Sequence, residues 1–276
     1  MGTSMSSKGI KGTTPLVPPW AEQGSDITIT NVETGESSDI SNEDIQREII
    51  EPLSIQPSQE RLKGARRAFG DYAKSLGNKD DLKGALKKYS KAIGGGSGAS
   101  RRLASSITAG TGLFALLNGN SVSTSEGSLS LQSLTGLSTD QAIDKISTFL
   151  APNSADFDQV RSAMNSSLSE ALEAYPDFDD VEITPEVLGD VFTCYLTDIV
   201  FEQVVLDMGD AWLKAETPLV QVQMENDIRE LTKVIVDSAL HKASKGNFSS
   251  ITQQNISSVQ IQAIKSVIEE WESFNG

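Results

Sequence analysis

The stretch SRRLASSITAGTGLFALL, residues 100–117, decides the fold class of this chain. Its positions on one helical face follow a 4-3-4-3 spacing and are Leu103, Ile107, Gly110, Phe114 and Leu117. That spacing is typical of a helix that packs along a coiled-coil-like seam. Ser, Thr and Gly interrupt the uncharged segment 103–125, whereas a membrane span needs about 20 predominantly apolar residues. We therefore expect a buried helix here and no membrane contact.

Helical signals flank this stretch on both sides. Thr184-Pro185 and Thr217-Pro218 each place a capping hydroxyl before a proline at the first helical position. Ser138 with Gln141 forms a capping box, and Ser257 with Gln260 repeats that pattern. The expected helices cover approximately residues 58–73, 79–93, 100–117, 138–150, 155–175, 185–212, 218–240 and 257–271. With only 6% aromatic residues, the core must rely on aliphatic side chains. The predicted class is all-α, a multi-helix bundle or an irregular helical array with a disordered N-terminal tail.

Composition divides the chain into four regions. Residues 1–57 are rich in Ser, Thr, Gly and Pro and too polar to offset the entropy of ordering, which predicts a flexible tail. Within this tail, the alternation in residues 26–30 predicts a short strand. We expect a basic helical region at 58–118, a Ser/Gly-rich loop at 119–137 and an acidic helical domain at 138–276.

The net charge of −15 is unevenly distributed along the chain. Residues 61–102 hold 12 Lys/Arg against 3 Asp/Glu, whereas the segments on both sides are acidic. The candidate anion-binding residues in this basic region are Arg66, Arg67, Lys87, Lys88, Arg101 and Arg102. Such a face could contact a nucleic-acid backbone. It could equally lie in solvent, or dock against acidic surface of the same chain or of a second copy.

The residue types for catalysis are sparse. His241 is the only histidine and Cys194 the only cysteine, so neither a zinc site nor a His-based triad can be assembled. The glycine run 94–98 lacks the Lys and hydroxyl residue of a phosphate-binding loop, and we interpret it as a helix C-cap and linker. We expect a protein that is not an enzyme and has no cofactor. The single cysteine and the absence of an apolar segment after Met1 favour the cytoplasm.

The first twenty residues form a distinctive peptide. They are small and polar up to a polyproline-type segment, Pro15–Pro19, which Trp20 follows as an aromatic anchor. Removal of Met1 would leave Gly2 as the N-terminal residue. We expect a peptide of this kind to be gripped by the active site of another protein.

This opening, with Met1-Gly2-Thr3-Ser4 and Pro15-Leu16-Val17-Pro18-Pro19-Trp20, resembles that of the QatB family of the bacterial Qatuor (QatABCD) anti-phage system. The basic segment Arg61–Phe69 and the glycine run before Arg101-Arg102 also look similar. The resemblance implies three partners, namely an ATPase, a QueC-like enzyme and a TatD-like nuclease.

The resemblance further implies that the QueC-like enzyme activates a 7-deazaguanine carboxylic acid and joins it to the N-terminal amine of this chain. Gly2 fits that position because glycine has no Cβ and lets its amine approach closely. Small Thr3 and Ser4 would thread a narrow channel, and Pro18, Pro19 and Trp20 would set the docking depth. Gly9 or Gly12 could be the terminus if more than Met1 is removed. Two alternatives stay open, a nucleic-acid-binding adaptor that uses residues 61–102 and a structural scaffold for the ATPase and nuclease.

Overall fold

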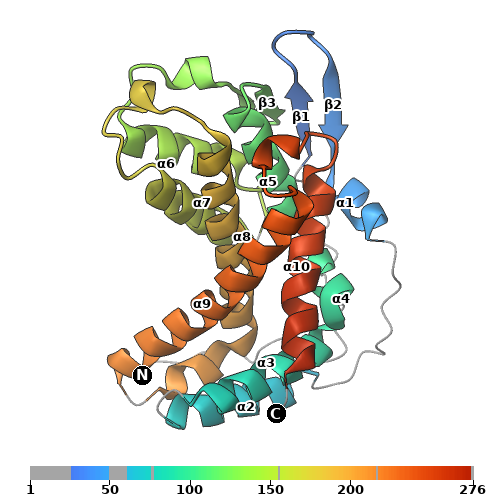
Figure 1. The fold of residues 1–276 in the computed structure, drawn as a ribbon, viewed down its shortest axis with the longest axis vertical. Coiled ribbons are helices and arrows are strands. Elements are labelled where there is room, and N and C mark those ends of the chain that lie inside the picture. The colour runs from blue at the N-terminus through green and yellow to red at the C-terminus, as the bar shows by residue number, and fades with distance from the viewer. Residues whose placement is uncertain (1–25, 50–60, 76–77, 155, 216, 275–276) are drawn as a thin grey trace, which may run out of the picture.

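The computed structural model describes residues 26–49, 61–75, 78–154, 156–215 and 217–274. In these residues the α-helices are α1 (Asn42–Glu48), α2 (Lys63–Lys74), α3 (Lys79–Ile93), α4 (Gly95–Arg102), α5 (Ala104–Leu117), α6 (Thr139–Leu150), α7 (Phe157–Ala171), α8 (Pro185–Met208), α9 (Pro218–Ala243) and α10 (Ile256–Ser273). Short 3-10 helices are η1 (Leu131–Leu134), η2 (Phe178–Asp180), η3 (Gly209–Lys214) and η4 (Phe248–Ser250). The predicted helical class is confirmed, and the arrangement is an irregular helical array (Figure 1).

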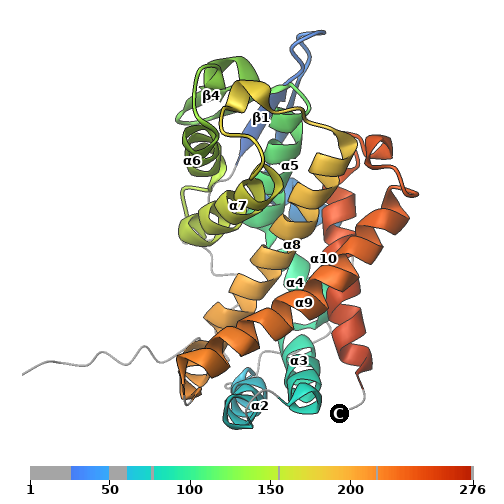
Figure 2. The ribbon, with the colours of Figure 1, turned by 60° about the vertical axis from the view of Figure 1, so that its left-hand side comes forward.

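A small antiparallel sheet accompanies the helices. Its strands, in the order β2-β1-β3-β4, are β1 (Ile27–Thr30), β2 (Ser37–Ile40), β3 (Ser121–Thr124) and β4 (Gly127–Leu129). The sheet lies at one end of the molecule, and α2 and α3 lie at the other end (Figures 1 and 2). Helices α8, α9 and α10 run between these ends, so they connect the two parts of the structure.

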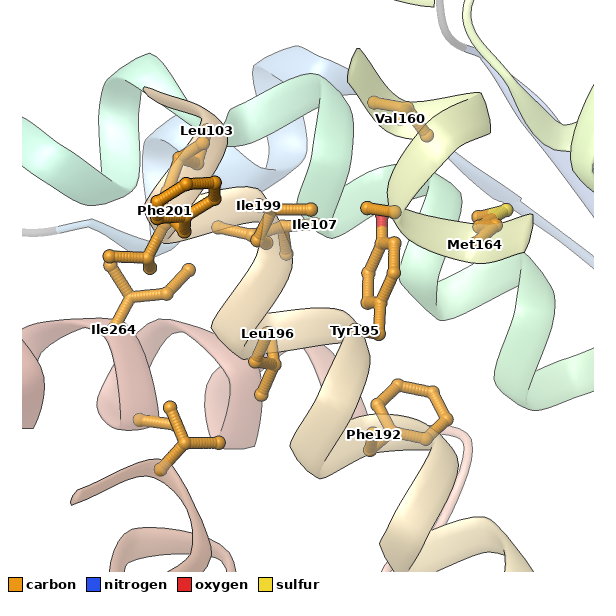
Figure 3. Packing of buried hydrophobic residues seen from close by; sticks show 14 of the residues in the cluster. Leu103, Ile107, Val160, Met164, Phe192, Tyr195, Leu196, Ile199, Phe201 and Ile264 are labelled. Carbon is orange, nitrogen blue, oxygen red and sulfur yellow. The ribbon is translucent and has the colours of Figure 1, made fainter. Parts of the chain in front are cut away.

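Helix α5 is the centre of the core. All of its residues are buried, so it packs on every side and not along a single coiled-coil-like seam as the spacing predicts. The predicted helix at 100–117 is also divided, because α4 ends at Arg102 and α5 begins at Ala104. Figure 3 shows Ile107 of α5 near Tyr195 of α8, whose hydroxyl donates to the carbonyl of Ser106 at 2.7 Å. Buried side chains from the predicted basic and acidic regions belong to one hydrophobic cluster.

The segment 26–49 is folded, in contrast to the flexible tail predicted for 1–57. Ile27 and Ile29 lie on the same face of β1 and are both buried in the core, which confirms the strand expected there. Ile45 of α1 is buried, and Asn42 accepts a hydrogen bond from Thr108 of α5 at 2.8 Å. Strand β2 of the same segment is polar and mostly exposed, so the composition of the segment does not reveal its few buried residues. Residues 1–25 and 50–57 lie outside the described residues, as does Ser58, which the sequence marks as a helix cap.

The segment predicted as a loop at 119–137 is also ordered differently. It contains the β3–β4 hairpin and η1, and it buries Val122, Leu129 and Leu134. The Ser/Gly content reflects strands whose second face is polar. Strand β3 pairs with β1, which lies far away in the sequence, so local composition does not reveal the pairing.

The glycine run 94–98 caps one helix and starts the next. Gly94 ends α3 with φ 95°, as the C-cap prediction requires, but the predicted linker is in fact α4. A Cβ at Gly96 would lie 3.0 Å from the Cα of Lys265 on α10. Glycine is therefore needed here because the α4 and α10 backbones approach closely.

The predicted starts of α3, α6, α8 and α9 are confirmed. Thr184 and Thr217 accept hydrogen bonds at the starts of α8 and α9, and Ser138 forms the capping box of α6. The start of α10 differs, because its N-cap is Asn255 and the Ser257 hydroxyl donates instead to Glu48 at 2.9 Å. None of the helices in the described residues combines the length and apolarity that a membrane span needs.

Candidate functional site

The predicted modification and partner-binding residues lie outside the described residues. They are Gly2, Thr3, Ser4, Pro18, Pro19 and Trp20. The first described strand, β1, starts at Ile27 and is paired on both sides.

The predicted anion-binding residues lie on α2, α3 and α4, and they are placed in three different environments. Arg102 is buried in an ion pair. Arg66, Lys87 and Arg101 are half-buried, and each donates to a backbone carbonyl. Arg67 and Lys88 are exposed. The structure therefore does not gather the six side chains into one exposed basic face.

The buried ion pair joins the basic and the acidic regions of the chain. The Arg102 guanidinium, at the end of α4, contacts the carboxylate of Asp207 in the last turn of α8. The Tyr89 hydroxyl on α3 donates to the second carboxylate oxygen at 2.9 Å, and Arg66 Nε donates to the Asp207 carbonyl at 2.8 Å. We call these four residues the Asp207 cluster. A carboxylate that is 0% exposed needs such partners, because an unpaired buried charge is strongly destabilising.

The cluster changes the ionisation of neighbouring groups. Burial, reinforced by the negative charge of Asp207, raises the pKa of the Tyr89 phenol well above its usual value. Burial and the positive charge of Arg102 lower the pKa of Arg61, while Asp207 opposes that shift. Tyr89 therefore stays protonated and donates its hydrogen bond across the neutral pH range.

The three half-buried cations each donate a hydrogen bond to a backbone carbonyl at the C-terminal end of a helix. Arg66 reaches a carbonyl in the last turn of α8, Lys87 reaches the Phe274 carbonyl just after α10 at 2.6 Å, and Arg101 reaches the Ile49 carbonyl just after α1 at 3.3 Å. Carbonyl groups at helix C-termini lack intrahelical donors and carry the negative end of the helix dipole. These contacts favour the intramolecular alternative left open by the sequence.

Asp207 is the residue that sequence reasoning missed. Its position follows Val200 and Val204 by seven and three residues, so it falls on the buried face of α8. A carboxylate on an apolar helical face signals a buried partner, but helical periodicity could not identify Arg102 as that partner.

The single cysteine and the single histidine, which the sequence analysis considered for catalysis and metal binding, are not members of the Asp207 cluster. Cys194 of α8 is buried, and burial raises the pKa of its thiol to about 11, with a further contribution from Glu170. His241 lies exposed in the last turn of α9, near the helix end where the sequence places it. Among the described residues, no group of three or more His, Cys, Asp or Glu side chains is arranged to hold a metal ion.

Comparison with known families identifies the kind of protein to which this helical array belongs. A family model described as "QatB: Qat anti-phage system associated protein QatB" matches residues 94–271. The match runs from the C-cap of α3 through most of α10 and covers more than half of the chain. No curated protein and no solved structure matches it. The chain is thus a protein of the Qat anti-phage system.

Within that system, the chain belongs to the QatB family, as the resemblance of its sequence indicates. The matched range includes the glycine run before Arg101-Arg102. It does not include residues 1–20 or Arg61–Phe69, on which the resemblance also depends. The two sources of evidence therefore come largely from different parts of the chain.

Proposed function

We propose that this chain is a non-enzymatic component of the Qat anti-phage system whose N-terminal glycine is modified by a QueC-like partner. The partner would use ATP to convert a 7-deazaguanine carboxylic acid into its acyl adenylate with release of pyrophosphate. The N-terminal amine would then attack the acyl carbon, form the amide and release AMP and a proton. The observation that carries the proposal is the combination of a QatB-family body with the small, glycine-led opening of residues 1–20. Gly2 is the preferred acceptor.

Chain length is compatible with this role. About 25 residues separate Gly2 from Ile27, and a chain spans at most about 3.5 Å per residue. The N-terminal amine could therefore enter the active site of another protein while the helical body stays outside. The side chains of Thr3 and Ser4 would pass a narrow channel, and Pro18, Pro19 and Trp20 would dock at its entrance.

A non-enzymatic role agrees with the state of the one thiol. Cys194 is buried, and a pKa of about 11 keeps it protonated at neutral pH, so it is a poor nucleophile. We accordingly assign the chemistry to the partner and the acceptor amine to this chain.

The nucleic-acid alternative has less support. Of the six candidate anion-binding residues, only Arg67 and Lys88 are exposed. The Nε atom of Arg67 lies 4.0 Å from a carboxylate oxygen of Asp71 on the same helix. The scaffold alternative, in which the body assembles the ATPase and the TatD-like nuclease, does not need residues 1–20 to be modified.

Deletion of residues 2–20 tests these alternatives against one another. Under the proposed function, the deletion abolishes modification by the co-expressed QueC-like partner and leaves the body folded. Under the adaptor alternative, nucleic-acid binding stays intact, and under the scaffold alternative, the deletion weakens one protein contact. Gly2→Ala and Gly9→Ala, compared in the full chain, then identify which glycine is the acceptor, since only the variant of the true terminus should lose modification efficiency.

A further inference from the structure

The exposed apolar side chains of the structure are concentrated at the turn between α8 and α9. Six large apolar side chains are exposed in the described residues, and four of them lie within residues 206–222. These four are Leu206 at the end of α8, Leu213 in η3, and Leu219 and Val222 at the start of α9, and they are 52–82% exposed. We call them the hairpin patch. Single exposed apolar residues are normal, but their concentration in one place marks an interaction surface.

One contact shows that the patch residues of α8 and α9 belong to a common row. The Nη2 atom of Arg229 on α9 lies 3.8 Å from Oε1 of Glu202 on α8. Leu206 follows Glu202 by one helical turn, and Val222 precedes Arg229 by two turns, so both lie on the sides of the helices that this contact joins. Leu219 precedes Val222 by a further turn. The row therefore continues as apolar side chains to the turn, which lies at the same end of the molecule as α2 (Figures 1 and 2).

Opposite charges flank the hairpin patch. On the side of the turn, α2 packs against η3, and a Cβ at Gly70 would lie 3.0 Å from Cδ of Lys214. Residues 63–74 of α2 hold four Lys/Arg and one Asp, so this edge is basic. On the other side, burial and the negative charge of nearby Glu225 raise the pKa of Glu202, and these two carboxylates form an acidic edge. The patch thus lies between a basic and an acidic edge.

We propose that the hairpin patch is the contact surface of a homodimer, in which a second copy of this chain covers it. With a two-fold axis across the middle of the row, the apolar row of one copy meets the same row of the other. The same rotation brings the basic edge of each copy to the acidic edge of the other, so that Arg67 would meet Glu225. A surface of one charge sign would match one edge and repel the other, whereas a second copy matches both. This inference does not depend on modification of the N-terminus.

Sedimentation velocity of the full chain between about 1 and 100 µM tests the proposal. The wild type should form a dimer with a dissociation constant of about 10 µM or tighter. Leu213→Glu with Leu219→Glu should weaken dimerisation at least tenfold. Val32→Glu and Val234→Glu place the same charge at exposed positions outside the hairpin patch, so they should leave dimerisation unchanged. Because all four positions are exposed, circular dichroism should show that every variant is folded.

A charge reversal gives a second readout. Arg67→Glu and Glu225→Lys should each weaken dimerisation, because each brings like charges together across the two-fold axis. The double variant should recover wild-type dimerisation, since both members of each pair are then reversed.

Three results would overturn the proposal. One is a wild type that stays monomeric up to about 100 µM. The second is a dimer that persists unchanged in Leu213→Glu with Leu219→Glu, or that the double charge variant does not recover. The third is a dimer that deletion of residues 2–20 abolishes, because the N-terminal segment would then make the contact.

Discussion

The Arg102 guanidinium and the Asp207 carboxylate form an ion pair that is almost entirely buried, with side-chain exposures of 6% and 0%. Arg102 lies at the end of α4, in the basic region, and Asp207 lies in the last turn of α8, in the acidic region. The attraction between these opposite charges therefore joins the basic region to the acidic region. The ion pair also removes Arg102 from any external anion-binding face.

Loss of the Asp207 charge should be strongly destabilising. We expect Asp207→Asn to lower the free energy of unfolding by about 3–5 kcal/mol, because Arg102 would keep a buried charge without its counter-ion. Urea unfolding at pH 7 measures this change. Asp210→Asn, at an exposed position in η3, is the control and should change stability by less than about 0.5 kcal/mol. Equal effects of the two substitutions would contradict the assigned role of the ion pair.

The close packing of α5 gives a second prediction. A Cβ at Gly110 would lie 2.8 Å from the Tyr195 ring and closer still to Gln260 Oε1. Gly110→Ala should therefore destabilise the protein by about 1–3 kcal/mol through overpacking.

The matched control is Gly64→Ala on α2, where a Cβ would meet no atom within 4 Å. That substitution should stabilise the protein by about 0.5–1 kcal/mol, because alanine favours the helix. Thermal unfolding of both variants measures these changes in stability. A Gly110→Ala protein as stable as the wild type would show that α5 is not tightly packed.

Alkaline pH should weaken the fold. Burial raises the pKa of Tyr89 above its usual value of 10.0 and that of Cys194 from 9.0 to about 11. Because the folded state favours the protonated forms, their stabilising contribution is complete below about pH 9. It decreases as the pH rises above the unfolded values, from about 9 for the thiol and 10 for the phenol.

Urea unfolding between pH 8 and pH 11 should show this loss of stability. Tyr89→Phe removes one of the titrating groups, so its stability should decrease less steeply above pH 10, by up to about 1.4 kcal/mol per pH unit. The variant should also be less stable at pH 8, because Asp207 loses a hydrogen-bond donor. Parallel pH profiles of variant and wild type would refute the proposed contribution of Tyr89.

Nucleic-acid binding should be weak and non-specific. The net charge is −15, and among the six candidate residues only Arg67 and Lys88 are exposed. We expect a dissociation constant for duplex DNA no tighter than about 10⁻⁶ M at physiological salt. Tighter, sequence-selective binding that Arg67→Gln with Lys88→Gln abolishes would instead favour the adaptor alternative.

The parts of the fold that local chemistry determines were predictable from the sequence. Helix α3 occupies the predicted residues 79–93, and the hydroxyl caps of Thr184 and Thr217 start α8 and α9. Each of these features depends on side chains within a few residues of the helix end.

The features that escaped prediction depend on distant partners. β1 pairs with β3 across most of the N-terminal half, and α4 is helical where Gly96 meets Lys265 of α10. In the same way, the basic residues could be recognised from the sequence, but not Asp207 or the helix C-termini that accept their hydrogen bonds. Composition singled out the first twenty residues as a peptide for another protein's active site, whereas their modification was inferred from the resemblance, and both roles stay predictions.

The central claim, that the N-terminus is a substrate for modification, is tested most directly by the intact mass of the full chain. The protein is purified after co-expression with an active QueC-like partner and, separately, without it. We predict a partner-dependent increase in mass that matches one 7-deazaguanine acyl group. The added group should map to the N-terminal peptide, at Gly2 or at a later glycine that becomes the terminus when more than Met1 is removed. An unshifted mass in the presence of a demonstrably active partner would contradict the claim.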